Sequence, residues 1–295
     1  MQNTMKFKKI KATASGIIFA LCLSGAAEAG PFILDLTDAD DHGSGNATEN
    51  FDGWLYMQKV LENLAPGVTN GNKVVVQLGA TGSEAAAAAS SAFNHSSLVA
   101  DGWTWMNIDG VADLTGFFDG TGLVTIADVG LIQLDSGFHA GGGTTAAELA
   151  VFTTFAATID SFLGAGGGLH SMAQGGTGQY GWLSALLPAL TFDTVQRSGL
   201  FLTPDGTAAF PGLTDSDLSA GPYHGTWTGG LGGLSVLFDN TAGDGGLVAG
   251  IGSGGGSITN PGGPGRLPEP SALALLGLGL VGIGFAQYRR RRKTS

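Results

Sequence analysis

The 295-residue chain contains a single cysteine, Cys22, and few basic residues outside its two ends. One cysteine excludes an intramolecular disulfide framework and a cysteine zinc cluster. Of the 24 acidic residues only Glu28 and Glu269 lie outside residues 30–268, whereas nine of the 13 basic residues do, which leaves this central part with a net charge of −18. Such a charge repels phosphate backbones and argues against nucleic-acid binding. The negative charge favours the binding of cations, or solubility outside the cell.

Glycine is abundant, with 52 residues, but it follows no Gly-X-Y period, so a collagen-like chain is excluded. The hydrophobic share of 43% excludes a wholly disordered chain. The length suits one large domain or two small ones.

The first 29 residues have the three parts of a secretory signal peptide. Basic residues at 6–11 precede an apolar run at 17–23, and the small residues Ala27 and Ala29 then stand at positions −3 and −1 before Gly30. This order predicts export across a membrane and cleavage by signal peptidase between Ala29 and Gly30.

The C-terminus has a second tripartite pattern. The motif Pro268-Glu269-Pro270 precedes an uncharged, mostly apolar stretch at 272–286 and then the basic cluster 289–293. The stretch is short for a full membrane span, which takes about 20 residues. This tail, 267–295, resembles the PEP-CTERM sorting signal. The resemblance implies that an exosortase of the inner membrane recognises Pro-Glu-Pro, cleaves the chain and releases it toward the outer surface of a Gram-negative, exopolysaccharide-making bacterium. The alternative is a simple membrane anchor.

Between these ends, strand and helix patterns alternate. Short apolar runs predict strands, and apolar residues at helical spacing predict helices. The predicted strands are 32–36, 73–78, 103–108, 127–134, 169–173, 200–202 and 234–238, and the predicted helices are 51–64, 83–89, 111–118, 144–163 and 182–190. The alternation predicts a three-layer α/β domain with a mainly parallel sheet over residues 30–249. Residues 250–266, rich in Gly, Ser and Pro, predict a flexible linker.

Residues 127–190 resemble the class I glutamine amidotransferase-like fold, a flavodoxin-like relative. The resemblance rests on ADVGLIQLDSG, FLGAGGG, LHSMA and GGTGQYG. It implies a cysteine nucleophile after the LHSMA strand, where this chain has His170, Ser171 and Met172. It also implies a later histidine that is followed two residues on by an acid, whereas His224 is followed by Gly225 and Thr226. These departures favour a non-catalytic domain. The alternative is a hydrolase that uses Ser171 with His170 or His224, although neighbouring strand residues point to opposite faces.

Residues 38–49 partly fit a calcium-binding loop of the EF-hand type. Asp38, Asp40 and Glu49 fall at loop positions 1, 3 and 12, with Gly43 at position 6. His42 at position 5 is a poor ligand for calcium, and the loop follows a strand rather than a helix. The alternatives are a calcium site and an acidic, solvated loop.

Polar residues follow three predicted strands, and parallel strand ends gather at one edge of a sheet. These groups could therefore share a crevice that holds a sugar or a metal; the alternative is solvated loops without a ligand. The groups are Asp38, Asp40, Asp41 and His42; Asp135, Ser136 and His139; and His170 and Ser171. The aromatic residues Trp103, Trp105, Phe117 and Phe118 have the spacing of core residues, whereas Trp227, flanked by glycines, is predicted to be exposed and available for carbohydrate stacking.

Together these patterns predict an exported, exosortase-sorted protein of the cell surface or extracellular matrix. Its domains are the signal peptide 1–29, the α/β domain 30–249, the linker 250–266 and the sorting tail 267–295. Its predicted partners are signal peptidase, exosortase, the inner membrane through 272–286 before processing, and surface polysaccharide. The favoured role is non-catalytic, in association with exopolysaccharide or biofilm, and needs no cofactor. The alternatives are an envelope hydrolase that uses a Ser/His or metal site at the strand ends, and an adhesin that binds calcium.

Overall fold

The computed structural model describes residues 30–42, 54–79, 83–137, 143–173, 181–195, 199–218, 225–231, 234–241 and 248–250. They belong to one compact unit that extends from Ala27 to Glu269. The predicted signal peptide, the linker beyond Gly250 and the sorting tail lie outside the described residues. The candidate site residues Gly43, Glu49, His139 and His224 lie outside them as well.

An eight-stranded sheet forms the centre of this unit, in the order β3-β2-β4-β5-β1-β10-β9-β7. Its strands are β1 (Phe32–Asp35), β2 (Val74–Leu78), β3 (Thr104–Ile108), β4 (Leu131–Leu134), β5 (Gly168–Ser171), β7 (Leu200–Leu202), β9 (Val236–Asn240) and β10 (Val248–Gly250). The first five strands of the order pair in parallel, and β10, β9 and β7 continue the sheet antiparallel. The predicted α/β fold with a mainly parallel sheet is therefore confirmed.

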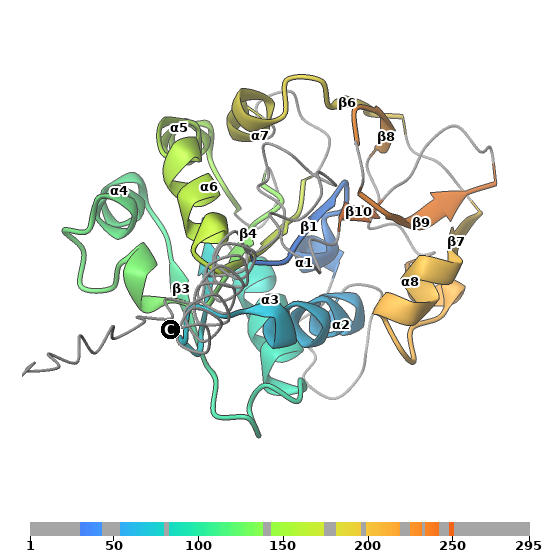
Figure 1. Ribbon diagram of the computed structural model, residues 1–295, viewed down its shortest axis with the longest axis horizontal. Helices are drawn as coiled ribbons and strands as arrows, with labels where there is room; N and C mark the ends of the chain where they lie inside the picture. Colours follow the sequence, from blue (N-terminus) through green and yellow to red (C-terminus); the bar gives the residue numbers. More distant parts are fainter. Residues whose placement is uncertain are drawn as a thin grey trace, which may run out of the picture. The chain divides into compact units, whose positions relative to one another are not determined.

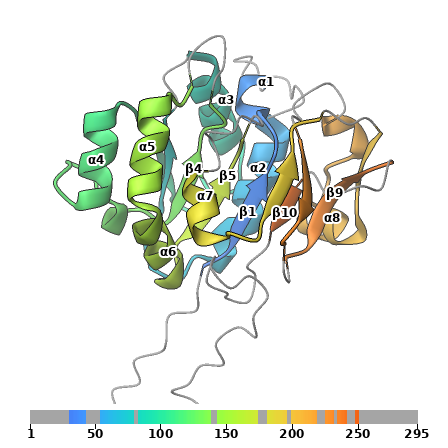
Figure 2. The ribbon, with the colours of Figure 1, turned by 90° about the horizontal axis from the view of Figure 1, so that it is seen from above.

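Helices cover both faces of the parallel strands (Figures 1 and 2). One face carries α1 (Ala39–His42), α2 (Trp54–Leu64) with the short 3-10 helix Ala65–Gly67, and α3 (Ser83–Asn94). The other face carries α4 (Val111–Asp119), α5 (Ala146–Thr154), α6 (Ala156–Gly164) and α7 (Gly181–Leu186). The remaining elements are 3-10 helices at Ile126–Asp128 and Asp215–Leu218, the helix α8 (Pro204–Ala209) against β9, and a ribbon of β6 (Thr191–Asp193) with β8 (Thr226–Gly229).

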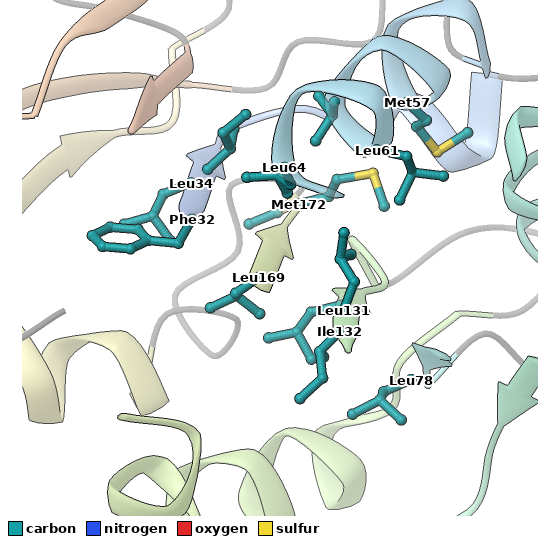
Figure 3. Packing of buried hydrophobic residues seen from close by; sticks show 14 of the residues in the cluster. Phe32, Leu34, Met57, Leu61, Leu64, Leu78, Leu131, Ile132, Leu169 and Met172 are labelled. Carbon is teal, nitrogen blue, oxygen red and sulfur yellow. The ribbon is translucent and has the colours of Figure 1, made fainter. Parts of the chain in front are cut away.

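The core lies on both sides of these strands. Val75, Val76 and Leu78 of β2 and the apolar residues of β4 and β5 are buried, as expected for parallel strands that are covered on both faces. Figure 3 shows Met57, Leu61 and Leu64 of α2 on one side of the strands and Ile132 and Leu169 on the other. The apolar face of α2 buries all three of its labelled side chains, so the predicted amphipathic pattern is confirmed.

The predicted helix 144–163 is two helices, α5 and α6, which meet at an angle of 56°. Phe155, at the junction, departs from α-helical geometry, with φ −101° and ψ 17°. The hydroxyls of Thr153 and Thr154 donate to the carbonyls four residues earlier, at 3.0 and 2.8 Å, a contact that bends helices. Apolar spacing predicted the buried face correctly but carried no signal for the bend.

The predicted strand 127–134 is also shorter than expected, since β4 begins at Leu131. Thr125 and Asp128 form a capping box in which the Asp128 carboxylate accepts from the Thr125 amide at 2.9 Å and from its hydroxyl at 2.8 Å. These bonds coil residues 126–128 into a 3-10 helix. At the other end of the domain, Gly250 is the last residue of β10 and pairs with Ile33, one residue past the predicted domain boundary.

No single helix among the described residues is long and apolar enough to cross a membrane, although α5 and α6 pass the same test together as a bent pair.

Candidate functional site at the carboxyl edge of the sheet

The chain leaves neighbouring strands of this sheet toward opposite faces. After β2 it enters α3, whereas after β4, which lies beside β2, it enters α5 on the other face. Parallel sheets bind ligands where connections diverge in this way, outside the carboxyl ends of the strands. The candidate site is therefore the edge where β2 and β4 end, at Leu78 and Leu134.

Asp40 and Ser136 meet at this edge, as the sequence predicted. The Ser136 hydroxyl and amide donate to the two carboxylate oxygens of Asp40, at 2.7 and 3.2 Å. Asp40 is fully buried and Ser136 is 1% exposed. The pair therefore joins α1, which follows β1, to the loop after β4.

Asp135 organises the same loop from inside. One of its carboxylate oxygens accepts from the Gly137 amide at 2.8 Å and from the amide and hydroxyl of Thr144 at 2.7 and 2.9 Å. Thr144 also contacts the carbonyl of Gly79, at the end of β2, at 3.4 Å. Asp135 thus fixes the entry to α5 and ties the ends of β2 and β4 together.

His170 lies beneath this edge rather than in it. Its Nε2 is 2.6 Å from Oδ2 of Asp35, and its Nδ1 is 3.1 Å from the amide nitrogen of Gln133. Tyr56 of α2 donates its hydroxyl to the same Asp35 oxygen at 2.7 Å. All four side chains are fully or almost fully buried. Burial, and then the charge of Asp35 and the hydrogen bond to it, raise the pKa of Tyr56 well above its usual value.

His170 and Gln133 belong to a polar row that crosses four strands on the face covered by α2 and α3. The register places Asn107, Gln77, Gln133 and His170 side by side on β3, β2, β4 and β5. Neither amide atom of Gln77 has a hydrogen-bond partner, although the side chain is fully buried. Sequence reasoning missed this row. The available signal was the recurrence of glutamine one residue before the last in VVVQL and LIQL.

Ser171 projects to the opposite face of β5 from His170, and the two side chains are not brought together. Its register neighbours are Leu34 and Leu134, on the two adjacent strands. Both ring nitrogens of His170 are meanwhile engaged by Asp35 and Gln133. The geometry gives Ser171 no base from His170, and His224 lies outside the described residues.

A carboxyl pair that the sequence analysis did not single out lies at the end of β3. Glu148 accepts from the Gly110 amide at 2.8 Å and forms a capping box with Thr145 at the start of α5. Burial, and then the hydrogen bond to Glu148 and its charge, raise the pKa of Asp109 to about 6. Burial raises the pKa of Glu148 too, but hydrogen bonds from Thr145, Asp109 and Gly110 outweigh it and lower that pKa.

The calcium prediction rests on Asp38, Asp40 and Glu49. Asp38 and Asp40 are fully buried, on either side of the first residue of α1, and Asp40 binds Ser136. The described part of the chain contains no group of three or more His, Cys, Asp or Glu residues arranged to hold a metal ion. Since Glu49 lies outside that part, calcium binding stays a prediction.

The prediction for Trp227 was wrong. The side chain is 1% exposed, and its indole nitrogen donates to the Leu34 carbonyl at 3.3 Å. Pairing of β8 with β6 and an edge contact with Phe192 bury it. Trp103, Phe117 and Phe118 are core residues, as their spacing indicated, and Trp105 is half-buried.

Comparison with known families identifies a PEP-CTERM protein-sorting motif at residues 267–292. Comparison with curated proteins and with solved structures finds no match. The motif implies that the chain is exported and sorted by an exosortase to the surface or the extracellular space.

Proposed function

We propose that this chain is an exosortase-processed envelope protein whose α/β domain acts outside the inner membrane as a non-catalytic module associated with surface polysaccharide. The observation that carries the proposal is the sorting motif at 267–292, which sets the route of export. The acidic composition of residues 30–268 is consistent with a protein that stays soluble outside the cell.

The arrangement of polar groups at the sheet edge and beneath it supports a non-catalytic role. Asp40 is held by Ser136, Asp135 by Thr144, and His170 by Asp35 and Gln133. Each contact fixes a loop or a strand, and a general base needs a free nitrogen or oxygen near its nucleophile. The domain also lacks the cysteine nucleophile that the amidotransferase-like resemblance implies, since the single cysteine, Cys22, lies in the predicted signal peptide.

The order of four strands supports the proposed relation to flavodoxin-like domains. The strands β3-β2-β4-β5 follow the flavodoxin-like order, in which the first of the four lies between the second and the third. The fifth place is taken by β1, from the N-terminal end of the domain, instead of by a later strand. This relation concerns the fold alone.

Peptide mapping by mass spectrometry in the native host tests the route. We expect a chain that starts at Gly30, ends near Pro268-Glu269-Pro270 and lies in the outer-membrane or medium fraction. Glu269→Ala should hold a longer form in the inner membrane, whereas Ser271→Ala, beside the motif, should be processed normally. Mature inner-membrane protein that keeps residues 289–293 would show a simple anchor instead.

Two binding and activity assays test the role of the domain. The processed protein should sediment with exopolysaccharide purified from its host, and the same protein after thermal unfolding should not. Equal sedimentation of both forms would remove the polysaccharide proposal. Turnover of envelope ester or glycan substrates that disappears in Ser171→Ala would contradict the non-catalytic role and favour the hydrolase.

A further inference from the structure

The residue that signal cleavage would place at the N-terminus is built into the domain. The backbone nitrogen of Gly30 donates to the Leu163 carbonyl at 2.7 Å, and Gly30 is buried. The next residue, Pro31, accepts from the Leu169 amide at 3.0 Å, so the chain enters β1 directly from this contact. The predicted cleavage point therefore lies immediately before a residue that the fold holds.

The surroundings of Gly30 admit only glycine. A Cβ atom at this position would overlap the carbonyl oxygen of Gly167. Gly167 itself lies in the tight turn that closes α6, where its amide donates to the Phe162 carbonyl at 3.0 Å. The backbone of residue 30 is thus packed directly against the backbone of the turn after α6.

The acceptor of the Gly30 nitrogen lies at the end of a helix. Leu163 is the residue before the last of α6, and its carbonyl also accepts from the Gly166 amide at 2.9 Å. The carbonyls at a helix C-terminus carry a partial negative charge that favours a cation. Only uncharged residues contact Gly30 and Pro31 in these hydrogen bonds and close approaches. They are Leu163, Gly67, Gly167 and Leu169. The ionisable residue of α6 itself, Asp160, lies one turn before Leu163 and carries a charge of the sign that attracts a cation.

We propose that the ammonium group created at Gly30 by signal cleavage is a structural part of the mature domain, seated on the C-terminal carbonyls of α6. Before cleavage the same nitrogen is a neutral amide, which makes the hydrogen bond but lacks the charge. Removal of the leader therefore strengthens the junction between β1 and α6. The proposal rests on the proposed export, because it requires a leader that is removed after Ala29.

The amino group can be probed on the exported protein itself. Processed protein from the outer fractions is treated with acetic anhydride near neutral pH, natively and in urea, and acetylation of Gly30 is followed by mass spectrometry with the exposed Lys73 as internal reference. A raised pKa of one unit makes the free amine tenfold scarcer, so we expect native Gly30 to react about tenfold more slowly than in urea, relative to Lys73. Equal relative rates would overturn the proposal.

Thermal unfolding gives a second readout. Unmodified protein should melt roughly 2–4 °C higher than Gly30-acetylated protein near pH 7, which is the shift expected for one charge–dipole contact in a domain of this size. A charge held by the helix carbonyls as proposed raises the folded pKa of the amine, so this advantage should be complete below the unfolded value of about 7.7–8 and be lost as pH rises through the folded value. Identical melting of both forms at every pH would contradict the proposal.

The outcomes separate this proposal from the export on which it rests. A chain that keeps its leader in the inner membrane argues against export, and one that is exported but starts at another residue overturns only the role of Gly30. Gly30→Ala should still be processed, because alanine is small, yet should accumulate less folded protein than the wild type. Where that variant does not fold, the acetylation and melting comparisons on wild-type protein decide.

Discussion

His170 and Asp35 are joined by a hydrogen bond of 2.6 Å between residues 135 positions apart in the chain, and neither side chain is exposed. Asp35 lies at the end of β1 and His170 in the adjacent strand β5. The remaining carboxylate oxygen of Asp35 accepts from the amide and hydroxyl of Thr37, at 3.0 and 2.6 Å. The pair therefore links the first strand of the domain to the fifth and to the loop that leads toward Asp40.

Removing one member of this pair should destabilise the domain strongly. His170→Leu leaves Asp35 buried with Tyr56 and Thr37 as its partners, and the loss of one partner from a buried pair costs about 3 kcal/mol or more of unfolding free energy. Tyr56→Phe keeps the ring and loses one hydrogen bond to Asp35, so we expect a loss of about 1–2 kcal/mol. Urea unfolding of both variants gives the measurement. A midpoint unchanged in His170→Leu would show that the pair adds no stability.

The sequence predicted the parallel strands well, because each is a short apolar run that ends near glycine or a polar residue. It did not predict the partner of His170, because apolar periodicity carries no information on which strands lie side by side. The pairing of β1 with β5 brings Asp35 to His170, and only the strand order reveals it. The same holds for Asp40 and Ser136, whose meeting was predicted from the common edge but whose hydrogen bonds were not.

Trp227 shows a different limit of sequence reasoning. Glycines on both sides made it look exposed, but glycine near an aromatic residue is equally compatible with close packing of backbone. A Cβ at Gly225 would overlap the carbonyl oxygen of Asp193 in β6, so glycine is needed there to let the ribbon close over the indole. Local composition did not distinguish an exposed turn from a tight junction.

The carboxyl pair at the end of β3 should make stability depend on pH. Because the folded pKa of Asp109, about 6, lies above its unfolded value near 3.9, its contribution is complete below pH 3.9 and is lost as pH rises toward 6. Asp109→Asn removes this dependence. We expect the variant to melt higher than wild type at pH 7, with a gain of about 0.5–1 kcal/mol after screening by solvent, and the gain to shrink toward pH 4.

The exposed Asp101 supplies the matched control for this measurement. Asp101→Asn should follow the wild-type melting curve from pH 4 to 7, because it removes a carboxylate outside the pair. A pH profile of Asp109→Asn that parallels the wild type would show that Asp109 and Glu148 do not share the proton.

Two helical glycines should respond oppositely to alanine. In α8 a Cβ at Gly206 would overlap the Leu237 carbonyl of β9, whereas Gly164 at the end of α6 has no heavy atom within 4 Å of that position. Alanine normally favours a helix over glycine by about 1 kcal/mol. Gly164→Ala should therefore be neutral or stabilising, and Gly206→Ala should lower the unfolding free energy by about 1–3 kcal/mol through overpacking. A stabilised Gly206→Ala in urea unfolding would show that α8 is not held closely against β9.

The capping box of α5 should contribute measurably to the stability of the domain at the edge of the sheet where the candidate site lies. The Thr145 hydroxyl and amide contact one carboxylate oxygen of Glu148 at 2.8 and 2.7 Å, and the other oxygen binds Gly110 at the start of α4. Thr145→Ala loses the cap and should lower the free energy of unfolding by about 1 kcal/mol, whereas Thr154→Ala, on the exposed side of the same helix, should change it by less than about 0.5 kcal/mol.

Hydrogen exchange adds a local readout of the same contact. Because Glu148 connects α5 to α4, Thr145→Ala should speed exchange at the Gly110 amide as well as in the first turn of α5. Faster exchange in α5 alone would mean that Glu148 holds Gly110 without the help of the cap.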